Sequence, residues 1–291
     1  MFSVLLYLLI LAGLIYWVES QTSLLPNILI TKKSNPAEEL ESWLKKFNWL
    51  NRHEPLSHGH FPKYKFYSEI VEILLNLSRK MGGSYQDSML FLREGLQADK
   101  QFEKKLKEMI LGTWLQMGLL VVLTWGFIFG ALALVDVKIN LLRLIMIALW
   151  QGIGMSLLPF LLKYFRKKFF GDIGKLWKML YVLRSLVKVP LSRTEVLTIA
   201  GVTELKNIQQ KSLIHIVEKL KQTCQRALQQ GGSYEDDVLS LMGELRFQEK
   251  WHFELFEKRL MVIKLALMSI FFLPSYLAFI FLLLGDLLTL M

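Results

Sequence analysis

Four long stretches of the chain contain no Asp, Glu, Lys or Arg. They are residues 1–18, 109–135, 144–162 and 265–285. A helix needs about 20 predominantly apolar residues to cross the hydrocarbon core of a bilayer, and each stretch is close to that length or exceeds it. The chain is also 53% hydrophobic, above the roughly 45–50% of soluble domains. These features predict a membrane protein and exclude a soluble enzyme and a disordered chain.

Extending the third and fourth stretches at their N-terminal ends gives four predicted transmembrane helices, at residues 1–18, 109–135, 141–162 and 261–285. Two polar, lysine-rich segments separate them, residues 19–108 and 163–260. Each segment has a usual size for a domain, and no alternating apolar–polar pattern indicates a strand. We therefore predict an all-α membrane protein with two helical-bundle domains and four transmembrane helices. The first helix lacks a basic start and a small-residue cleavage site, so we interpret it as an uncleaved anchor.

Most of the positive charge lies in the two polar segments. Of the 35 Lys and Arg residues, 14 lie in residues 19–108 and 18 in residues 163–259. Because Lys and Arg next to membrane spans mark the cytoplasmic side, we expect both domains in the cytoplasm and both termini outside. The same clusters could bind nucleic acid or anionic lipid. Topology explains them without a ligand, and we expect no nucleic-acid partner.

The two polar segments share a sequence motif. Gly-Gly-Ser-Tyr-Gln-Asp at residues 82–87 recurs as Gly-Gly-Ser-Tyr-Glu-Asp at residues 231–236, an offset of 149 residues. Two further matches keep the same order, residues 70–72 with 216–218 and residues 102–106 with 256–260. Ordered self-similarity of this kind indicates an internal duplication. The predicted unit is a helical domain followed by a transmembrane helix.

The shared motif predicts a sharp corner between two helices. Paired glycines suit a helix end, because Gly adopts the left-handed conformation at little cost. The following Ser is a good N-cap, and the Asp three residues later can reach back to it, as in a capping box. The predicted structural or interaction residues of the two corners are Gly82, Gly83, Ser84, Asp87, Gly231, Gly232, Ser233 and Asp236. A contact surface for partners is an alternative use of the same corners.

The helices beside each corner are predicted to be amphipathic. In the first copy the apolar stripe is Ile70, Val71, Ile73, Leu74, Leu77 and Met81, continued by Tyr85, Met89, Leu92 and Leu96. In the second copy it is Leu213, Ile216, Val217, Leu220, Cys224 and Leu228. Such stripes usually face a core. We interpret Cys224, the one cysteine of the chain, as a small buried apolar group and not as a reactive thiol.

Motifs for catalysis and cofactor binding are absent from the sequence. It contains no P-loop, Gly-x-Ser-x-Gly, His-Glu-x-x-His or Rossmann fingerprint. The close pair His58 and His60 lacks a third ligand at metal-binding spacing. We therefore predict no catalytic, cofactor-binding or metal-binding residues, and no cofactor.

The uncharged stretches also lack the ionisable residues that mark transport pathways. Gln116 and Gln151 are interpreted as isolated polar groups. Pro159 and Pro274 are predicted to kink the third and fourth spans. Glycines that would let helices approach closely are Gly126, Gly130, Gly152 and Gly154.

With the duplication in view, the chain resembles a known family. Residues 200–205, Ala-Gly-Val-Thr-Glu-Leu, are similar to a helix corner of that family, with Gly201 as its glycine. Residues 230–239 are similar to a second corner, and Phe-Leu-Pro at residues 272–274 to its proline-bearing final span. The family comprises the inner-membrane platform proteins of bacterial type II secretion, type IV pilus and Tad (Flp) pilus machines, which share the type II secretion F domain. The anchor helix and a length near 300 residues point to the Tad-like branch.

The resemblance implies a non-enzymatic platform in the bacterial inner (cytoplasmic) membrane. Its expected partners are a cytoplasmic hexameric assembly ATPase, a pilin or pseudopilin, the lipid bilayer, and a paralogous platform protein or a second copy of the chain. The ATPase would move the two domains, and the membrane helices would pass that movement to subunits leaving the bilayer. Two alternatives remain open. A transporter or permease subunit needs polar or broken helices at mid-membrane, and a signalling or lipid-modifying protein needs a sensor domain or clustered carboxylates.

Overall fold

The computed structural model describes residues 35–46, 62–81, 86–134, 141–187, 189, 191–208, 210–230 and 234–290. All regular structure in these ranges is helical, and they contain no strand. The predicted all-α class is therefore confirmed. The chain divides into two compact units, Met1–Ser68 and Glu69–Met291.

The described part of the first unit contains one short helix, α2 (Pro36–Lys46). Asn35 precedes it, and its side-chain oxygen accepts a hydrogen bond from the Ala37 N–H at 3.3 Å. Acidic residues fill the first turn, where carboxylates interact favourably with the helix dipole. Ala37 and Leu40 are buried, so α2 has one apolar face.

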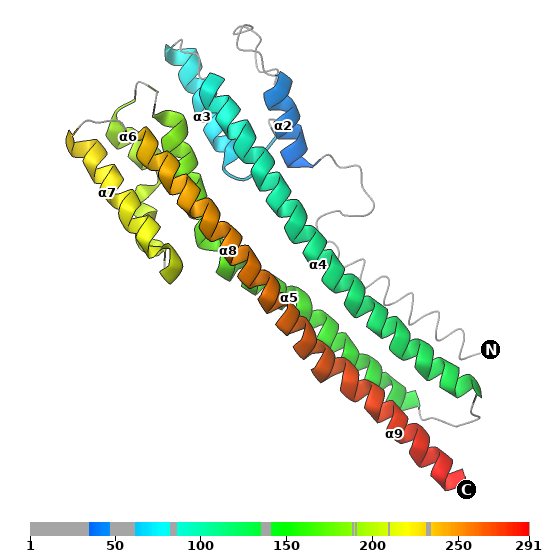
Figure 1. The fold of residues 1–291 in the computed structure, drawn as a ribbon. Coiled ribbons are helices and arrows are strands. Elements are labelled where there is room, and N and C mark those ends of the chain that lie inside the picture. The colour runs from blue at the N-terminus through cyan, green and yellow to red at the C-terminus, as the bar shows by residue number, and fades with distance from the viewer. Residues whose placement is uncertain are drawn as a thin grey trace. The chain divides into compact units, whose positions relative to one another are not determined.

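The described part of the second unit consists of three long helical elements and several shorter ones (Figure 1). The long elements are α4 (Gln86–Leu134), α5 (Leu141–Leu186), and α8 (Glu235–Leu267), which continues through the π-helical turn η3 (Met268–Phe272) into α9 (Leu273–Leu290). The shorter elements are α3 (Tyr67–Met81), α6 (Arg193–Ala200), the 3₁₀ turns η1 (Val202–Asn207) and η2 (Lys211–Leu213), and α7 (Ile214–Gln230).

Three of these elements are long and apolar enough, by length and composition, to cross a membrane. They contain the predicted spans 141–162 and 261–285 and, up to Leu134, the span 109–135, whereas residue 135 and residues 1–18 lie outside the described residues. The predicted domain boundaries at residues 108, 162 and 260 fall inside continuous helical elements. The residues at these boundaries are mainly Lys, Glu, Leu and Arg, with no Gly or Pro, and such residues favour an unbroken helix.

The pairs α3–α4 and α7–α8 have the same layout. α3 ends at Met81 and α4 begins at Gln86, while α7 ends at Gln230 and α8 begins at Glu235. Both boundaries are separated by the 149-residue offset of the Gly-Gly motif. The buried residues of α4 include Met89, Leu92 and Leu96, and those of α8 include Val238, Leu241 and Leu245, each 149 residues later. Positions at the same offset thus face the interior in both helices.

Most of the predicted apolar stripe is buried. The buried members are Ile70, Val71, Leu74, Met89, Leu92, Leu96, Leu213, Ile216, Val217, Leu220 and Cys224. Ile73 and Leu77 are half-buried, and Tyr85 and the Met81 side chain lie outside the described part of the chain. The prediction is wrong at Leu228, which is 48% exposed while Ala227 is buried. Both positions continue the helical spacing from Cys224, so the period alone does not choose between them.

The corner that begins at Gly201 is confirmed as the end of a helix. α6 starts with a capping box. The Glu195 backbone N–H donates to the Ser192 side chain, and the Ser192 backbone N–H donates to the Glu195 side chain. The hydrogen bonds from Ser192 lower the pKa of the Glu195 carboxyl. Gly201 ends the helix at φ 69° and ψ 33°, with its N–H directed to the carbonyls of Leu197 and Thr198. This left-handed conformation favours glycine.

α5 packs closely against α4 at Gly95. A Cβ added to Gly95 would lie 2.3 Å from the Tyr181 hydroxyl oxygen. The ring of Tyr181 is also 5.2 Å from the ring of Phe91, and the Ser88 hydroxyl donates to the Ser185 carbonyl at 2.9 Å. The absence of a side chain at Gly95 therefore sets how closely these two helices meet.

Candidate functional site

We call α4, α5 and the continuous element α8–η3–α9 the three-helix core. In the part of this core that lies outside the predicted spans, which we call its polar side, aromatic rings from all three helices meet. Phe102 of α4 lies 5.1 Å from Phe170 of α5 and 5.6 Å from Phe253 of α8, ring centre to ring centre. Phe256 of α8 lies 5.5 Å from Phe170 and 6.0 Å from Phe169. Edge-to-face aromatic pairs contribute about 0.5–1.5 kcal/mol each beyond their burial, so this cluster ties the three helices together.

Farther from the apolar segments, Arg184 of α5 joins α4 to α8. Its guanidinium forms an ion pair with Glu235 at the start of α8 and lies 5.7 Å from the ring centre of Phe91 on α4. Nearby, the Trp177 indole donates to Glu249 of α8 at 3.2 Å. α5 is therefore the central element through which the other two long helices are connected.

Inside the apolar segments, polar side chains also join the helices. The Trp125 indole of α4 donates to Gln151 Oε1 of α5 at 3.0 Å, and Lys264 of α8 donates to Gln116 Oε1 of α4 at 2.6 Å. The interpretation of Gln116 and Gln151 as isolated was wrong, because each finds a partner on a neighbouring helix. Sequence alone does not show which helices are neighbours. Hydrogen bonds between membrane helices stabilise their packing by about 0.6–2 kcal/mol.

The prediction that Pro274 disturbs the last span has a structural counterpart in η3. Proline has no N–H to donate to the carbonyl four residues earlier, which is that of Ile270. The Trp150 indole of α5 donates to this carbonyl at 3.1 Å. The helix accommodates the proline with a π-helical turn directly before it. Pro159, in contrast, lies inside α5, which remains helical on both sides.

Among the described residues, only one of the predicted glycines allows a close approach. A Cβ on Gly154 would lie 2.7 Å from the Phe271 side chain of η3, and the Trp150 ring lies 5.2 Å from the Phe271 ring. A Cβ on Gly126, Gly130 or Gly152 would meet no atom of the described part of the chain within 4 Å. The predicted close packing is therefore confirmed at Gly154 and not at the other three positions.

The predicted Gly-Gly corners lie mostly outside the described residues. This applies to Gly82, Gly83 and Ser84, and to Gly231, Gly232 and Ser233, so their capping roles remain predictions. Asp87 and Asp236 are exposed in the first turns of α4 and α8, where a carboxylate favours the helix dipole. α8 begins at Glu235 with Tyr234 before it and no capping side-chain hydrogen bond, so Asp236 is the second helical residue and not the third.

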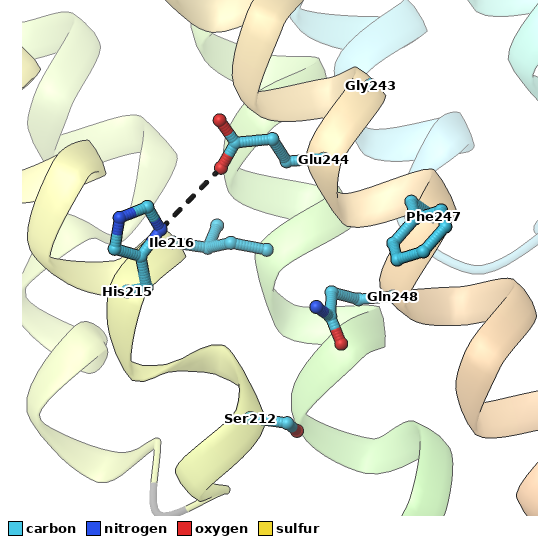
Figure 2. Close-up of a pocket in the computed structure, with 7 residues that line it drawn as sticks. All are labelled: Ser212, His215, Ile216, Gly243, Glu244, Phe247 and Gln248. Carbon is cyan, nitrogen blue, oxygen red and sulfur yellow. Dashed lines mark ion pairs between the residues drawn. The ribbon is translucent and has the colours of Figure 1, made fainter.

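A shallow hollow lies between α7 and α8 (Figure 2). Its volume is about 360 Å³, and it is lined by Ser212, His215, Ile216, Gly243, Glu244, Phe247 and Gln248. Glu244 forms an ion pair with Lys219 at 2.5 Å, and its other carboxylate oxygen lies 3.8 Å from the His215 Nδ1. Glu244, the one carboxylate that lines the hollow, therefore already interacts with side chains of α7.

Ser212, at the edge of this hollow, forms a hydrogen bond with the buried His252 at 2.8 Å. The pair combines a hydroxyl with an imidazole. The side chain that faces the other ring nitrogen, His252 Nδ1, is the amide of Gln210 at 3.5 Å and not a carboxylate. Gln210 Nε2 also lies 3.4–3.5 Å from the carbonyls of Lys168 and Phe169. Burial lowers the pKa of His252, which keeps the ring neutral in this structural contact.

Among the residues that the structure describes, no group of three or more His, Cys, Asp or Glu side chains is placed to hold a metal ion. Comparison with known proteins assigns no family: no family model, curated protein or solved structure matches the chain.

Proposed function

We propose that the chain is a non-enzymatic inner-membrane platform that couples a cytoplasmic assembly ATPase to the assembly of pilin or pseudopilin subunits, or to protein secretion. The observation that carries this proposal is the continuity of the long helices. Each runs without a break from a polar helical region into a segment able to cross a membrane. α4, with 49 residues, is about 70 Å long at 1.5 Å per residue.

Two sets of contacts suit such a transmitting role. The aromatic cluster joins the three helices on the polar side, and the bonds of Trp125 and Trp150 join them inside the apolar segments. A displacement of one polar end would therefore be shared by all three helices at two levels. Packed helices respond to force as rigid elements, because protein interiors are close-packed.

The proposed duplication and topology are part of the same account. The matching boundaries of α3–α4 and α7–α8 support two copies of one helical unit. In the proposed topology, both copies face the cytoplasm. The resemblance to proteins with the type II secretion F domain adds the partners: a hexameric ATPase, a pilin or pseudopilin, and a second copy or a paralogous platform protein. Both termini would lie outside.

The two alternative functions receive less support. A transporter or permease subunit would present polar groups along an open path, whereas the Gln151 side-chain oxygen is bonded to Trp125 and the residue is 3% exposed. A signalling or lipid-modifying protein would need a sensor domain or clustered carboxylates, and the side chain that faces Nδ1 of His252 is the amide of Gln210 and not a carboxylate.

The orientation is tested with reporter fusions in bacteria. Alkaline phosphatase is active only outside the cytoplasm, so fusions after Gly83 and Gly232 should be inactive and a fusion after Met291 active. The reverse pattern would overturn the proposed topology.

The function is tested by purification from native membranes and by gene deletion. The full chain in mild detergent should co-purify with a hexameric ATPase, and a deletion strain should lack surface filaments or secreted substrate. A deletion strain with normal filaments and secretion, together with no associated ATPase, would remove the proposal.

A further inference from the structure

A band of positive charge surrounds the three-helix core where its polar and apolar parts meet. We call it the basic collar and define it as Lys104, Lys105, Lys107, Lys163, Arg166, Lys167, Lys168, Lys258 and Arg259. The three short segments that carry it, residues 103–108, 163–168 and 254–259, contain only four carboxylates. The collar therefore concentrates a large part of the chain's net charge of +10 in three short helical segments.

Contacts between the helices place these segments at one level. Arg166 of α5 is paired with Glu103 of α4 at 2.9 Å, and Phe253 of α8 lies 5.6 Å from Phe102 of α4. One cation on each helix lies two to five residues closer to the apolar segments than these contacts: Lys105 follows Glu103, Lys163 precedes Arg166, and Lys258 follows Phe253. At 1.5 Å per residue this is about 3–8 Å, so the cations from the three helices form a single band.

The apolar surface starts immediately beyond the collar. Phe160 is 72% exposed, Met261 56% and Leu115 66%, which is the exposure expected of side chains that face lipid. Tyr164 is exposed at the boundary, with the Lys168 ammonium 5.9 Å from its ring centre. Tyrosine is enriched at the headgroup level of membranes. In a chain whose apolar segments cross a membrane, the collar would therefore lie at the depth of the lipid phosphates.

Most of the collar has no anionic partner in the protein. Arg166 is paired with Glu103, and Lys104 is 3.9 Å from Glu108. The other exposed cations, Lys105, Lys163, Lys167, Lys168, Lys258 and Arg259, have no carboxylate partner among the described residues. Elsewhere, Lys175, Lys178, Arg184, Lys219 and Arg226 are each paired with a carboxylate. Among the described residues, no carboxylate is paired with Lys206, Lys211 or Lys221, which lie far apart from the collar in sequence.

We propose that the basic collar binds the phosphate groups of anionic phospholipids in the leaflet next to the helical domains. Lysine and arginine side chains near a membrane surface attract anionic lipid, and the attraction adds over neighbouring cations. Bound headgroups would fix the depth and the rotation of the three-helix core in the bilayer. The inference depends on membrane insertion and not on the proposed coupling to an ATPase, so either can fail without the other.

The test measures which lipid the full-length protein retains. Purified protein in detergent is incubated with equal amounts of phosphatidylglycerol and phosphatidylcholine that carry the same acyl chains. It is then repurified, and the bound lipids are quantified by mass spectrometry. The wild-type protein should retain several times more phosphatidylglycerol than phosphatidylcholine. The triple variant Lys163→Gln, Lys167→Gln, Lys168→Gln should lower that ratio at least about fivefold.

Two matched variants separate the collar from fold and total charge. The triple variant Lys163→Arg, Lys167→Arg, Lys168→Arg keeps the charge and should keep the wild-type ratio. The variant Lys206→Gln, Lys211→Gln, Lys221→Gln removes the same charge from exposed positions on η1, η2 and α7 and should also keep it. A wild-type ratio near one, an unchanged ratio in the collar Gln variant, or an equal loss in the η1–η2–α7 variant would overturn the proposal.

Discussion

Several polar groups of the second unit, both side-chain and backbone, find their hydrogen-bond partner on a neighbouring helix. Ile270 illustrates this: its carbonyl loses its usual partner to Pro274 and receives the indole N–H of Trp150 from another helix. Cys224 is a contrasting case, since it is 6% exposed and packs as an apolar group. Burial raises the pKa of its thiol to about 11, which removes the reactive thiolate at neutral pH.

Cys224 gives a direct test of this packing because the chain has no other cysteine. In the folded protein at pH 7.5, we expect a maleimide to label Cys224 at least about 100-fold more slowly than in denaturant, since the thiol is both buried and protonated. The rate is measured by mass spectrometry in detergent. Labelling as fast as that of a free thiol would show that α7 does not pack as described.

His252 predicts a pH dependence of stability. Burial lowers its pKa from the ordinary 6.5, so the unfolded state takes up this proton more readily than the folded state. The contribution of neutral His252 is therefore full above about pH 6.5 and is lost as the pH falls toward its folded pKa. Thermal unfolding between pH 8 and pH 5 should show a falling Tm, and His252→Gln should reduce that fall.

A Tm that falls equally in the wild-type protein and in His252→Gln would contradict this prediction, because the pH dependence would then arise from other groups.

Helices in this chain meet through single small residues at specific positions, as Gly95 and Gly154 show. The surroundings of Gly154 and Gly126, two glycines of the apolar segments, predict effects of different size for the same substitution to Leu. Gly154→Leu would collide with Phe271 and should cost about 1–3 kcal/mol, whereas Gly126→Leu enters open space and should change stability by less than about 0.5 kcal/mol. Unfolding in mild detergent with increasing denaturant measures both. Equal effects would contradict the packing of α5 against η3.

Gly201 and Gly243 form a second matched pair outside the membrane segments. Gly201→Ala places a Cβ at φ 69° and should destabilise the protein by about 1–2 kcal/mol. Gly243 lies exposed inside α8 with open space around it, so Gly243→Ala should stabilise it by about 0.5–1 kcal/mol. Thermal unfolding of the two variants should shift in opposite directions.

The sequence predicts helices and their faces well and the partners of those faces poorly. The buried positions Leu92, Leu96 and Leu220 follow from periodicity, because helical geometry fixes which residues share a side. The bonds of Gln151 and Trp150 could not be predicted, because they depend on which helices become neighbours. The choice of Ala227 over Leu228 is of the same kind, since both positions fit the helical period.

At the scale of the whole chain, the second unit is a set of long helices that extend from polar regions into membrane-length apolar segments. This continuity is the central feature of the proposed platform, since a rigid helix can carry a displacement that a flexible linker would absorb. Gly-rich linkers behave as flexible coils. Glu108 and Met109 lie inside α4, where the predicted polar domain meets the predicted span. An insertion between them would interrupt the helix without removing a domain or a span.

The deciding measurement is the number of surface filaments, or the amount of secreted substrate, in a deletion strain that expresses a variant with four glycines inserted between Glu108 and Met109. The same insertion after Ile208, outside the long helices, serves as the control, and membrane levels of both variants are checked by immunoblot. The account predicts that the α4 insertion retains the associated ATPase but reduces filaments or secretion to the level of the deletion strain, while the control restores them. Wild-type filaments or secretion with the α4 insertion would contradict it.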